Sequence, residues 1–214
     1  MISKRLKESA KYVKGFHCLA DCGTDHGYLP IYVMKHGFVQ KAIASDNKEF
    51  PLQNARRNIF DEQVKVETIL ADGLPYLDDE IDVVSILGMG GRLIVEILAN
   101  ADLKDVKRLV LSPNSDQIVL RRFLQEHGFA IVEEIIIKDK SKYYQIIVSE
   151  PGAMTLSDIE FEFGPIIIEN KTQVFVDYIS KLIHKLEAAL QKTSTIQSRK
   201  ILENRIQLLK EVIS

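Results

Sequence analysis

Acidic residues and glycines recur at four points along the chain, and each point follows a short apolar run. The four points are DCGTDHG at residues 21–27, Asp46, Asp72-Gly73 and Gly88-Met89-Gly90-Gly91. Glycine lets the backbone turn sharply and approach a ligand closely, whereas a carboxylate accepts hydrogen bonds from hydroxyl and amino groups. These residue types suit a ligand that carries hydroxyl groups, amino groups and a positive charge.

The first loop narrows the identity of this ligand. A glycine-rich loop before a helix ordinarily binds a pyrophosphate, but the carboxylate of Asp25 in DCGTDHG would repel one. The loop is also not GxGxxG, so a nicotinamide dinucleotide, and with it an NAD oxidoreductase, is disfavoured. S-adenosylmethionine has a sulfonium, an amino group and a ribose diol but no phosphate, so we expect this cofactor. The alternative is a structural Asp-Gly turn that binds nothing.

The other three points fit a nucleoside cofactor. Asp46, with Asn47 beside it, lies roughly 20 residues after the loop, from where an acid accepts hydrogen bonds from ribose hydroxyls. Asp72 can accept one from the adenine amino group, and Gly73 leaves room beside it. The glycines of residues 88–91 would expose backbone groups where cofactor and target meet. For each point a solvated or tight turn is the structural alternative.

Cys18, Cys22 and His26 are evenly spaced, so a metal site has to be weighed. In an extended strand, residues at this spacing lie roughly 13 Å from each other, which is too far for a disulfide. Their side chains also spread along a line instead of converging on one ion, and no fourth ligand is evident. We therefore expect no disulfide and no metal.

The elements predicted around these residues place them at one edge of a sheet. Apolar runs typical of buried parallel strands alternate with helical segments as far as residue 128. The strands are expected at residues 16–21, 40–46, 64–70, 81–87 and 106–112, and the helices at 28–37, 51–60, 92–100 and 118–128. Ligands of such α/β sheets bind at the carboxyl ends of the strands, which is where all four points fall.

The segment that follows the alternating region indicates the fold more specifically. Two apolar segments, residues 129–139 and 142–150, are separated by a short polar turn and predict an antiparallel hairpin. Five strands that alternate with helices and are followed by such a hairpin are typical of the class I (Rossmann-like) methyltransferase sheet, in which one antiparallel strand lies among parallel ones. We predict this α/β fold for residues 1–152, with a helix at residues 3–14 that Ser3 caps.

Residues 153–214 are predicted to form a linker and a separate helical domain. Residues 153–170 have an irregular pattern with a break at Gly164-Pro165. Two long helices then follow, with a turn near residues 191–195. Their apolar residues recur at helical spacing, as in a small antiparallel coiled coil. These residues are Ile179, Ile183, Leu186 and Leu190, then Leu202, Ile206, Leu209 and Ile213.

Composition excludes several classes of protein. Of the 214 residues, 46% are apolar and 27% are charged, which excludes a disordered chain and a disulfide scaffold. No apolar run approaches the roughly 20 residues of a membrane-spanning helix. The basic N-terminus lacks the apolar segment of a secretory signal, so we expect a cytoplasmic protein without a membrane partner.

The net charge of −2 conceals two basic ends. Residues 171–214 carry eight Lys or Arg and four Asp or Glu, and the beginning of the chain is basic as well. Because phosphate attraction depends on the local face of a protein, these ends supply candidate nucleic-acid contacts. The candidates are Lys4, Arg5, Lys181, Lys185 and Arg199. The alternative is a solvated helix surface.

Several blocks of the sequence, in this order, resemble the bacterial tRNA (adenine-22-N1)-methyltransferase family, TrmK. The blocks are MISKRLKESAKYV, ADCGTDHGYLPIYV, AIASD, ADGL, LGMGGRLIVEIL, RLVLSPN, HGFAIVEE and KYYQIIV. Within them, GxDHxYLP and GMGG are the specific motifs. The resemblance extends over nearly the whole chain. It implies a class I methyltransferase fold, S-adenosylmethionine as cofactor and methylation of N1 of adenine 22 in tRNA.

The resemblance also implies roles for single residues. The first cofactor loop would contain Asp21, Gly23, Asp25 and His26; Asp46 would bind the ribose; Asp72 and Gly73 would flank the adenine; and Gly88, Met89, Gly90 and Gly91 would lie by the methionine moiety and the target base. Asn114 matches the family's LQPN block, which is LSPN here. The chain departs from the common family pattern at Cys22, Thr24, Gly27, Asp46, Phe50 and Ser112. None of these changes removes a candidate acid, but Phe50 alters the expected adenosine rim.

Methyl transfer to adenine N1 needs no strong general base, because N1 brings its own lone pair. Catalysis would come from alignment and from stabilising the positive charge that develops on the ring. The candidate catalytic residues are Asp25, His26, Tyr28 and Asn114. Tyr28 could stack on a flipped base or be the first core residue of its helix. His26 could act as an acid or base or be a hydrogen-bonded turn residue.

Two other functions compete with tRNA methylation. The same fold could methylate another RNA, a small molecule or a protein, although a small-molecule enzyme would not need a basic helical hairpin. The chain could also be a non-catalytic RNA-binding module, against which the acids at three strand ends argue. The sequence leaves the oligomeric state open, a monomer included.

Overall fold

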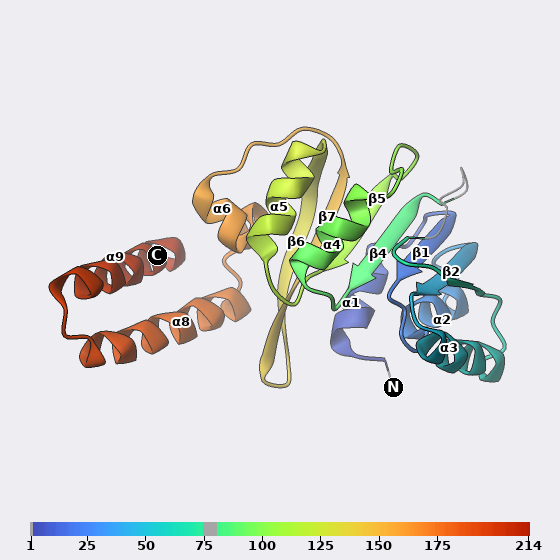
Figure 1. Ribbon diagram of the computed structural model, residues 1–214, viewed down its shortest axis with the longest axis horizontal. Helices are drawn as coiled ribbons and strands as arrows, with labels where there is room; N and C mark the ends of the chain where they lie inside the picture. The colour runs from blue at the N-terminus through green and yellow to red at the C-terminus, as the bar shows by residue number, and fades with distance from the viewer. Residues whose placement is uncertain (1, 75–80) are drawn as a thin grey trace.

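The computed structural model describes residues 2–74 and 81–214, and Figure 1 shows it as a ribbon. Within these residues one sheet has the strand order β3-β2-β1-β4-β5-β7-β6. The strands are β1 Cys18–Cys22, β2 Lys41–Asp46, β3 Glu67–Leu70, β4 Val83–Leu87, β5 Arg108–Ser112, β6 Phe129–Asp139 and β7 Lys142–Pro151. Every predicted strand is therefore present, and β3 is shorter than the predicted residues 64–70.

β7 makes the sheet mixed instead of purely parallel. β1 pairs in parallel with β2 and β4, and β3 and β5 extend this parallel part. β7 is antiparallel to both of its neighbours, β5 and β6. The tight turn after Asp139, in which Lys140 has φ 55°, returns the chain beside β6. The predicted class I arrangement, with an antiparallel strand among parallel ones, is confirmed.

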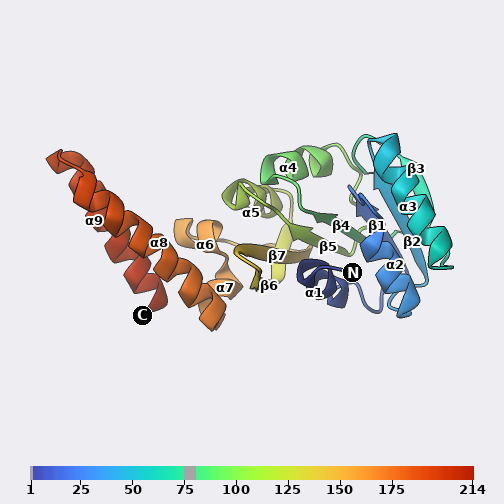
Figure 2. The same ribbon diagram turned by 90° about the horizontal axis from the view of Figure 1, so that it is seen from below.

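Helices cover both faces of the sheet, as Figure 2 shows. One face carries α4 Gly91–Ala99 and α5 Gln117–Glu126; the other carries α1 Lys4–Lys11 and α2 Tyr28–Lys35, and α3 Glu49–Asp61 packs beside α2. The strands between the two layers are apolar and almost wholly buried, as in β1, β4 and β5. Parallel strands of this kind occur where both faces are covered.

The connections between the strands agree with most of the prediction. Ser3 caps α1 as expected, because its Oγ accepts a hydrogen bond from the Leu6 N–H at 3.3 Å. β1, β2, β4 and β5 are each followed by a helix, so these strand–helix units are confirmed. After β3 the described residues contain no helix before β4, and residues 75–80 of this connection lie outside the described part of the chain.

The prediction of an irregular segment at residues 153–170 is wrong. The segment contains two short helices, α6 Asp158–Phe163 and α7 Pro165–Asn170. α6 begins with a capping box, in which Ser157 and Glu160 satisfy each other's backbone N–H groups. Pro165 is the first residue of α7, a position where its missing N–H costs nothing. Helices this short are missed because a helical period needs a window of roughly 11 residues or more.

The predicted helical hairpin follows these two helices. α8 Gln173–Lys192 and α9 Ile196–Ile213 lie side by side, with a short connection where the turn was predicted (Figures 1 and 2). Seven of the eight predicted apolar residues belong to one apolar core between the two helices, whereas Leu202 is only half-buried and is not part of that core. Ile179, Ile183, Ile206 and Leu209 are buried, and Leu186, Leu190 and Ile213 pack against them. The same core includes Ile136 of β6, so the hairpin is joined to the sheet by apolar contacts.

Hydrogen bonds from the arginine of a buried ion pair also join the two predicted domains. Arg121 of α5 and Glu134 of β6 are fully buried, and Arg121 Nε donates to Glu134 Oε1 at 2.8 Å. The other guanidinium nitrogens donate to Gln145 Oε1 at 2.7 Å and to the carbonyls of Phe161 and Glu162 in α6. Arg121 thus satisfies carbonyls that the end of a helix leaves without partners. A division of the chain at residue 152 stays a prediction.

Two further observations concern membrane-spanning helices and metal or disulfide sites, which the sequence disfavours. Among the helices of residues 2–74 and 81–214, none is long and apolar enough to cross a bilayer. Cys18 and Cys22 are buried thiols of β1. The same described residues contain no group of three or more His, Cys, Asp or Glu placed to hold a metal ion.

Candidate functional site

Loops at the carboxyl ends of β1 to β4 bring most of the predicted site residues together around two adjoining cavities. The first cavity, of about 290 Å³, contains Asp21, Gly23, Asp25, His26, Tyr28, Gly88 and Met89. The second cavity, of about 280 Å³, contains Asp46, Asn47, Asp72 and Gly73. Gly23, Asp25 and Met89 line both cavities, so the two form one crevice.

Asp21 lines the first cavity from the end of β1, and its exposed fraction is only 5%. Its carboxylate accepts a hydrogen bond from the Ser85 Oγ of β4 at 2.6 Å. Burial raises the pKa of Asp21 to about 6, because the loss of water outweighs the hydrogen bonds from Ser85 and Thr24. A cationic ligand would stabilise the ionised carboxylate, so the first cavity favours a positive group beside Asp21.

The side chain of Met89 lies over Gly23 where the two cavities join. Gly23 has φ +72°, and a Cβ at this position would lie 2.0 Å from Met89 Cε, far inside van der Waals contact. The sequence predicted that Gly23 lets the backbone turn and approach a ligand closely. In the structure the space that a Cβ would fill is taken by Met89, which lines both cavities.

Asp25 and Asp46 meet where the first loop reaches the end of β2. Asp46 Oδ2 accepts a hydrogen bond from the Asp25 N–H at 3.4 Å, and Asp46 Oδ1 accepts one from the Lys48 N–H at 3.0 Å. Each carboxylate oxygen has two lone pairs, so Asp46 keeps acceptor capacity for hydroxyl groups of a ligand. Asp25 is exposed, and its Oδ2 lies 3.6 Å from His26 Nε2.

The second cavity has a polar wall and an apolar wall. On the polar side Asn47 Nδ2 donates to Asp72 Oδ1 at 3.4 Å. The apolar side consists of Pro51 from α3 and of Leu93 and Ile97 from α4. A planar base with a polar edge fits between two such walls. Sequence reasoning missed the apolar residues, because the periodicity of a helix does not tell whether an apolar side chain faces the sheet or a cavity.

Cys22 also lines the second cavity, at the end of β1. Its Sγ donates to the Gly73 carbonyl at 3.2 Å. Burial, together with the nearby carboxylates of Asp21 and Asp46, raises the pKa of the Cys22 thiol to about 12. Cys22 therefore contributes a neutral, hydrogen-bonded thiol to the wall.

The glycines after β4 have different surroundings. Gly88 has φ +92° and lines the first cavity, and a Cβ there would lie 2.8 Å from Arg5 Nη2. Gly90 and Gly91 were predicted beside the methionine moiety, but they are packed against the loop after β5. A Cβ on Gly91 would lie 2.4 Å from the Asp116 carbonyl oxygen, and one on Gly90 would lie 3.3 Å from a side chain of the same loop. These two glycines let the start of α4 approach that loop.

Arg5 and Asn114 are bonded to each other beside Gly88. Arg5 Nη1 donates to Asn114 Oδ1 at 3.2 Å, and Asn114 Nδ2 donates to the Gly88 carbonyl. Arg5 is half-buried, and burial lowers the pKa of its guanidinium. The sequence predicted Arg5 as a surface contact to phosphate. The structure places it in the wall of the first cavity instead.

Tyr28 is the first residue of α2 and is 40% exposed, so the alternative that it is a core residue is excluded. Its ring centroid lies 5.3 Å from that of His26, and both rings line the first cavity. Asp25 lines the same cavity. Asn114, the fourth candidate catalytic residue, lies on the far side of Arg5.

Asn114 lines a third cavity, of about 530 Å³, which we call the tyrosine pocket. Its residues are Arg5, Asn114, Lys142, Tyr143, Tyr144 and Tyr178. Because Arg5 lines both this pocket and the first cavity, the tyrosine pocket adjoins the crevice. No sequence pattern predicted its tyrosines, which come from β7 and α8 and are brought together only in the folded chain.

Two of the basic candidates lie beside the tyrosine pocket. Lys4 Nζ donates to a carbonyl near the end of β6 at 3.3 Å. Lys181 Nζ lies 5.8 Å from the ring centroid of Tyr143. Lys185 is exposed further along α8.

Arg199 has a different environment from the other basic candidates. Its Nη1 donates to the carbonyls of Leu190 and Thr193, each at 3.2 Å. These carbonyls belong to the end of α8 and to the turn that leads into α9. Arg199 therefore holds the hairpin turn, and part of its donor capacity is already used.

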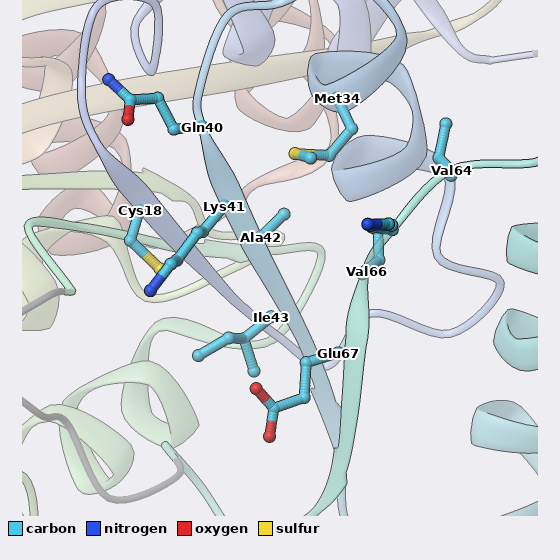
Figure 3. A pocket seen from close by; sticks show the side chains of 10 residues that line it. Cys18, Met34, Gln40, Lys41, Ala42, Ile43, Val64, Val66 and Glu67 are labelled. Atoms are coloured by element: carbon cyan, nitrogen blue, oxygen red, sulfur yellow. The ribbon is translucent and has the colours of Figure 1, made fainter.

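A cavity of about 580 Å³ lies at the opposite ends of β1, β2 and β3 (Figure 3). Figure 3 shows Cys18 and Ile43 on one side of β2 and Met34 and Ala42 on the other. This cavity contains none of the predicted site residues. The first and second cavities, which are smaller, hold the acids and glycines that suit a ligand.

Comparison with known proteins identifies the family that has this crevice. The family model of TrmK, tRNA (adenine(22)-N(1))-methyltransferase, matches residues 19–212. The chain belongs to the TrmK family. This membership confirms the resemblance that the motifs indicated, and the mixed sheet confirms the predicted class I fold.

TrmK relatives match the chain over its whole length. The tRNA (adenine(22)-N(1))-methyltransferase of Bacillus subtilis strain 168 is 31% identical, and the match covers 99% of this chain and 97% of the relative. A crystal structure of the Streptococcus pneumoniae protein Sp1610, a candidate tRNA (m1A22) methyltransferase, is 40% identical, covers both chains completely and has a TM-score of 0.95. The same protein in complex with S-adenosyl-L-methionine has a TM-score of 0.90.

Proposed function

We propose that this chain transfers the methyl group of S-adenosylmethionine to N1 of adenine 22 in tRNA. The observation that carries the proposal is an acid-lined crevice beside a cationic, tyrosine-rich pocket in a chain of the TrmK family. The cofactor predicted from the acids is the ligand bound in the Streptococcus pneumoniae relative.

The residues of the crevice fit a cationic nucleoside. We assign the second cavity to the adenosine, where Asp46 would accept hydrogen bonds from ribose hydroxyls and Asp72 from the adenine amino group. Leu93 and Ile97 would contact the base. We assign the first cavity to the methionine moiety, where Asp21 would attract the positive charge of the amino group. The absence of phosphate from this cofactor suits a crevice whose charged side chains are mostly acids.

When bound, the cofactor supplies an electrophilic methyl group, which adenine N1 attacks with its own lone pair as the C–S bond breaks. Positive charge moves from the sulfur to the adenine ring during this step. Asp25 lies exposed at the junction of the two cavities, where its carboxylate can offset the charge on the ring. Tyr28 offers an exposed ring on which a flipped base can stack.

Asn114 and His26 have supporting roles in this proposal. Asn114 is bonded to Arg5 and to the Gly88 carbonyl, so we assign it the positioning of Arg5 and of the Gly88 turn beside the first cavity. His26 lies 3.6 Å from Asp25 Oδ2, and we assign it the positioning of that carboxylate. No side chain has to remove a proton before the methyl group is transferred.

The exposed lysines would contact phosphates of the tRNA on either side of the target. Lys4, Lys181 and Lys185 are the residues that we assign to this role. We also propose that the reaction takes place in the cytoplasm, where tRNA is found.

The test is methylation of an unmodified tRNA transcript by the purified protein and S-adenosylmethionine. We expect N1-methyladenosine in digested nucleosides by mass spectrometry, and none from a transcript in which adenine 22 is replaced by guanine. Methylation of both transcripts would mean another target, and methylation of neither would refute the proposal. Calorimetry with the cofactor alone separates a catalytic protein from an RNA-binding module, since only the former needs this ligand.

A further inference from the structure

We propose that the tyrosine pocket binds an unpaired nucleobase of the tRNA next to the target adenine. The proposal rests on the proposed function, because it assumes that tRNA is the substrate. It goes beyond that function by assigning a second RNA-binding site, separate from the cofactor crevice. The target adenine itself belongs in the first cavity, since that is where the methyl group would be presented.

The tyrosine pocket is built from four segments that are far apart in the sequence. Arg5 comes from α1 and Asn114 from the loop after β5, whereas Lys142, Tyr143 and Tyr144 come from the start of β7 and Tyr178 from α8. The ring centroids of Tyr143 and Tyr178 are 5.2 Å apart, with their planes inclined at 55°. The pocket volume of about 530 Å³ lies within the range of ligand sites in proteins. A nucleobase with its ribose can therefore be accommodated.

Cations surround the tyrosines of this pocket. Lys138 Nζ and Lys181 Nζ lie 5.7 and 5.8 Å from the ring centroid of Tyr143, and Arg5 Cζ lies 4.9 Å from that of Tyr144. Within the described residues, neither lysine forms an ion pair with a carboxylate. Asp139 is the carboxylate that acts on Arg5, and its single negative charge does not balance the three positive charges of Arg5, Lys138 and Lys181. The ligand that suits this excess of positive charge is an anion.

Aromatic rings and cations together indicate a nucleotide instead of a simple anion. Every nucleobase has a flat π face that stacks on an aromatic side chain, and its phosphate is attracted to lysine and arginine. The target base would occupy the first cavity, which the Arg5 side chain and its bond to Asn114 separate from the tyrosine pocket. The base in the tyrosine pocket is therefore a neighbour of the target, splayed from the same strand.

Tyr143→Ala is the variant that tests this assignment, with Tyr143→Phe as the matched control. The phenylalanine keeps the stacking face, so it should behave like the wild type. For Tyr143→Ala we expect KM for tRNA to rise about tenfold, in line with the loss of one stacked base. We expect kcat and the cofactor Kd to stay within about twofold. A fall in kcat at unchanged KM, or no change in either constant, would overturn the proposal.

Entry of a base into the pocket can be measured directly with tRNA that carries 2-aminopurine in place of nucleotide 21 or 23. A base that leaves the RNA stack and enters the pocket changes its fluorescence on binding to the wild-type protein and to Tyr143→Phe. We expect this change at one of the two positions and its loss with Tyr143→Ala. Equal fluorescence changes with all three proteins, or none with any, would show that no base enters the pocket.

Lys142→Glu provides a second variant that does not depend on the core around Tyr143. Lys142 is exposed at the rim of the pocket, so its replacement should leave folding intact. We expect weaker tRNA binding than with Lys65→Glu, an exposed lysine at the far edge of the sheet. Equal binding of the two would count against the pocket. Because fluorescence and binding need no methyl transfer, they remain readable if the proposed methylation itself is not found.

Discussion

Met89 occupies the space that a side chain at Gly23 would need, since a Cβ on Gly23 would lie 2.0 Å from Met89 Cε. The two residues come from the loops after β1 and β4, which are neighbouring strands in the sheet. Their contact fixes the distance between the loops that would hold the two ends of the cofactor.

Gly23→Ala should destabilise the protein and weaken cofactor binding. The backbone strain of a left-handed residue costs roughly 1–2 kcal/mol, and the collision with Met89 adds to it. Gly37→Ala is the control, because Gly37 also has a positive φ but has open space around its Cβ position. Thermal unfolding should show a larger loss for Gly23→Ala. The additional variant Met89→Ala should recover the difference; failure to recover it would mean that Met89 is not the cause.

Cofactor binding should depend on pH through Asp21. Its pKa of about 6 means that much of the carboxyl is protonated near pH 5 and ionised near pH 8. Because the ionised form attracts the cationic cofactor, the Kd should fall as pH rises through about 6 and then level off. Calorimetry between pH 5 and pH 8 measures this. In Asp21→Asn this pH dependence of the Kd should be absent. If the variant showed the same pH dependence, another titrating group would be its cause.

The stability of the protein without cofactor gives an independent check on Asp21. Its pKa in the folded state, about 6, is higher than the ordinary value of 3.8 for this side chain, so the folded state prefers the protonated carboxyl. Ionisation therefore lowers the free energy of unfolding as pH rises from about 4 to about 6, by roughly 3 kcal/mol in all. Denaturant titrations of the wild type and of Asp21→Asn should differ by this step, with the two converging at low pH.

Asp46→Ala should weaken cofactor binding by about tenfold or more, because two hydrogen bonds from ribose hydroxyls to a charged acceptor would be lost. The affinity for tRNA should change little, since no phosphate contact is altered. Asp61→Ala is the control, an exposed acid at the end of α3 outside the crevice. Identical cofactor titrations for the two variants would refute the ribose role of Asp46.

Lys181→Glu combined with Lys185→Glu should weaken tRNA binding and flatten its dependence on salt. Each lost phosphate contact reduces the slope of log K against log salt by just under one. Arg199→Ala should instead lower the melting temperature and leave the slope unchanged, because Arg199 holds the hairpin turn. If the double variant kept the wild-type slope, α8 would not be an RNA-binding surface.

Arg121→Met should destabilise the protein by roughly 3–5 kcal/mol, because it leaves the charge of Glu134 buried without its partner. The control is Arg122→Met, next in the sequence, whose exposed ion pair with Asp158 contributes about 1 kcal/mol or less. Denaturant unfolding compares the two. A difference below 1 kcal/mol would mean that water reaches Glu134.

The fold was largely predictable because its signals are local. Apolar runs and short polar turns locate the strands, and the terminal hairpin indicates where an antiparallel strand enters the sheet. The seam of α8 and α9 was visible because Ile179 and Ile183, like Ile206 and Leu209, recur at helical spacing. α6 and α7 were missed because each contains only six residues, and their capping and proline signals resemble those of a turn.

The acids of the site were predictable for a topological reason, and its other parts were not. Parallel strands end at the same edge, so Asp21 and Asp46 had to lie near each other. The sequence could not show which neighbour makes a glycine necessary, as in the packing of Gly91 against a loop. Nor could it show that Arg5 and Tyr178 line the same pocket, since the proximity of distant segments depends on how the helices pack on the sheet.

The raised pKa of the Cys22 thiol makes this residue of the crevice wall chemically unreactive. A thiol that ionises only near pH 12 is almost entirely protonated under physiological conditions, and thiolate is the form that reacts with alkylating agents and peroxides. The wall beside the nucleoside site therefore carries sulfur without carrying a reactive nucleophile. The Cys22 thiol should therefore resist oxidation as long as it stays buried in this wall.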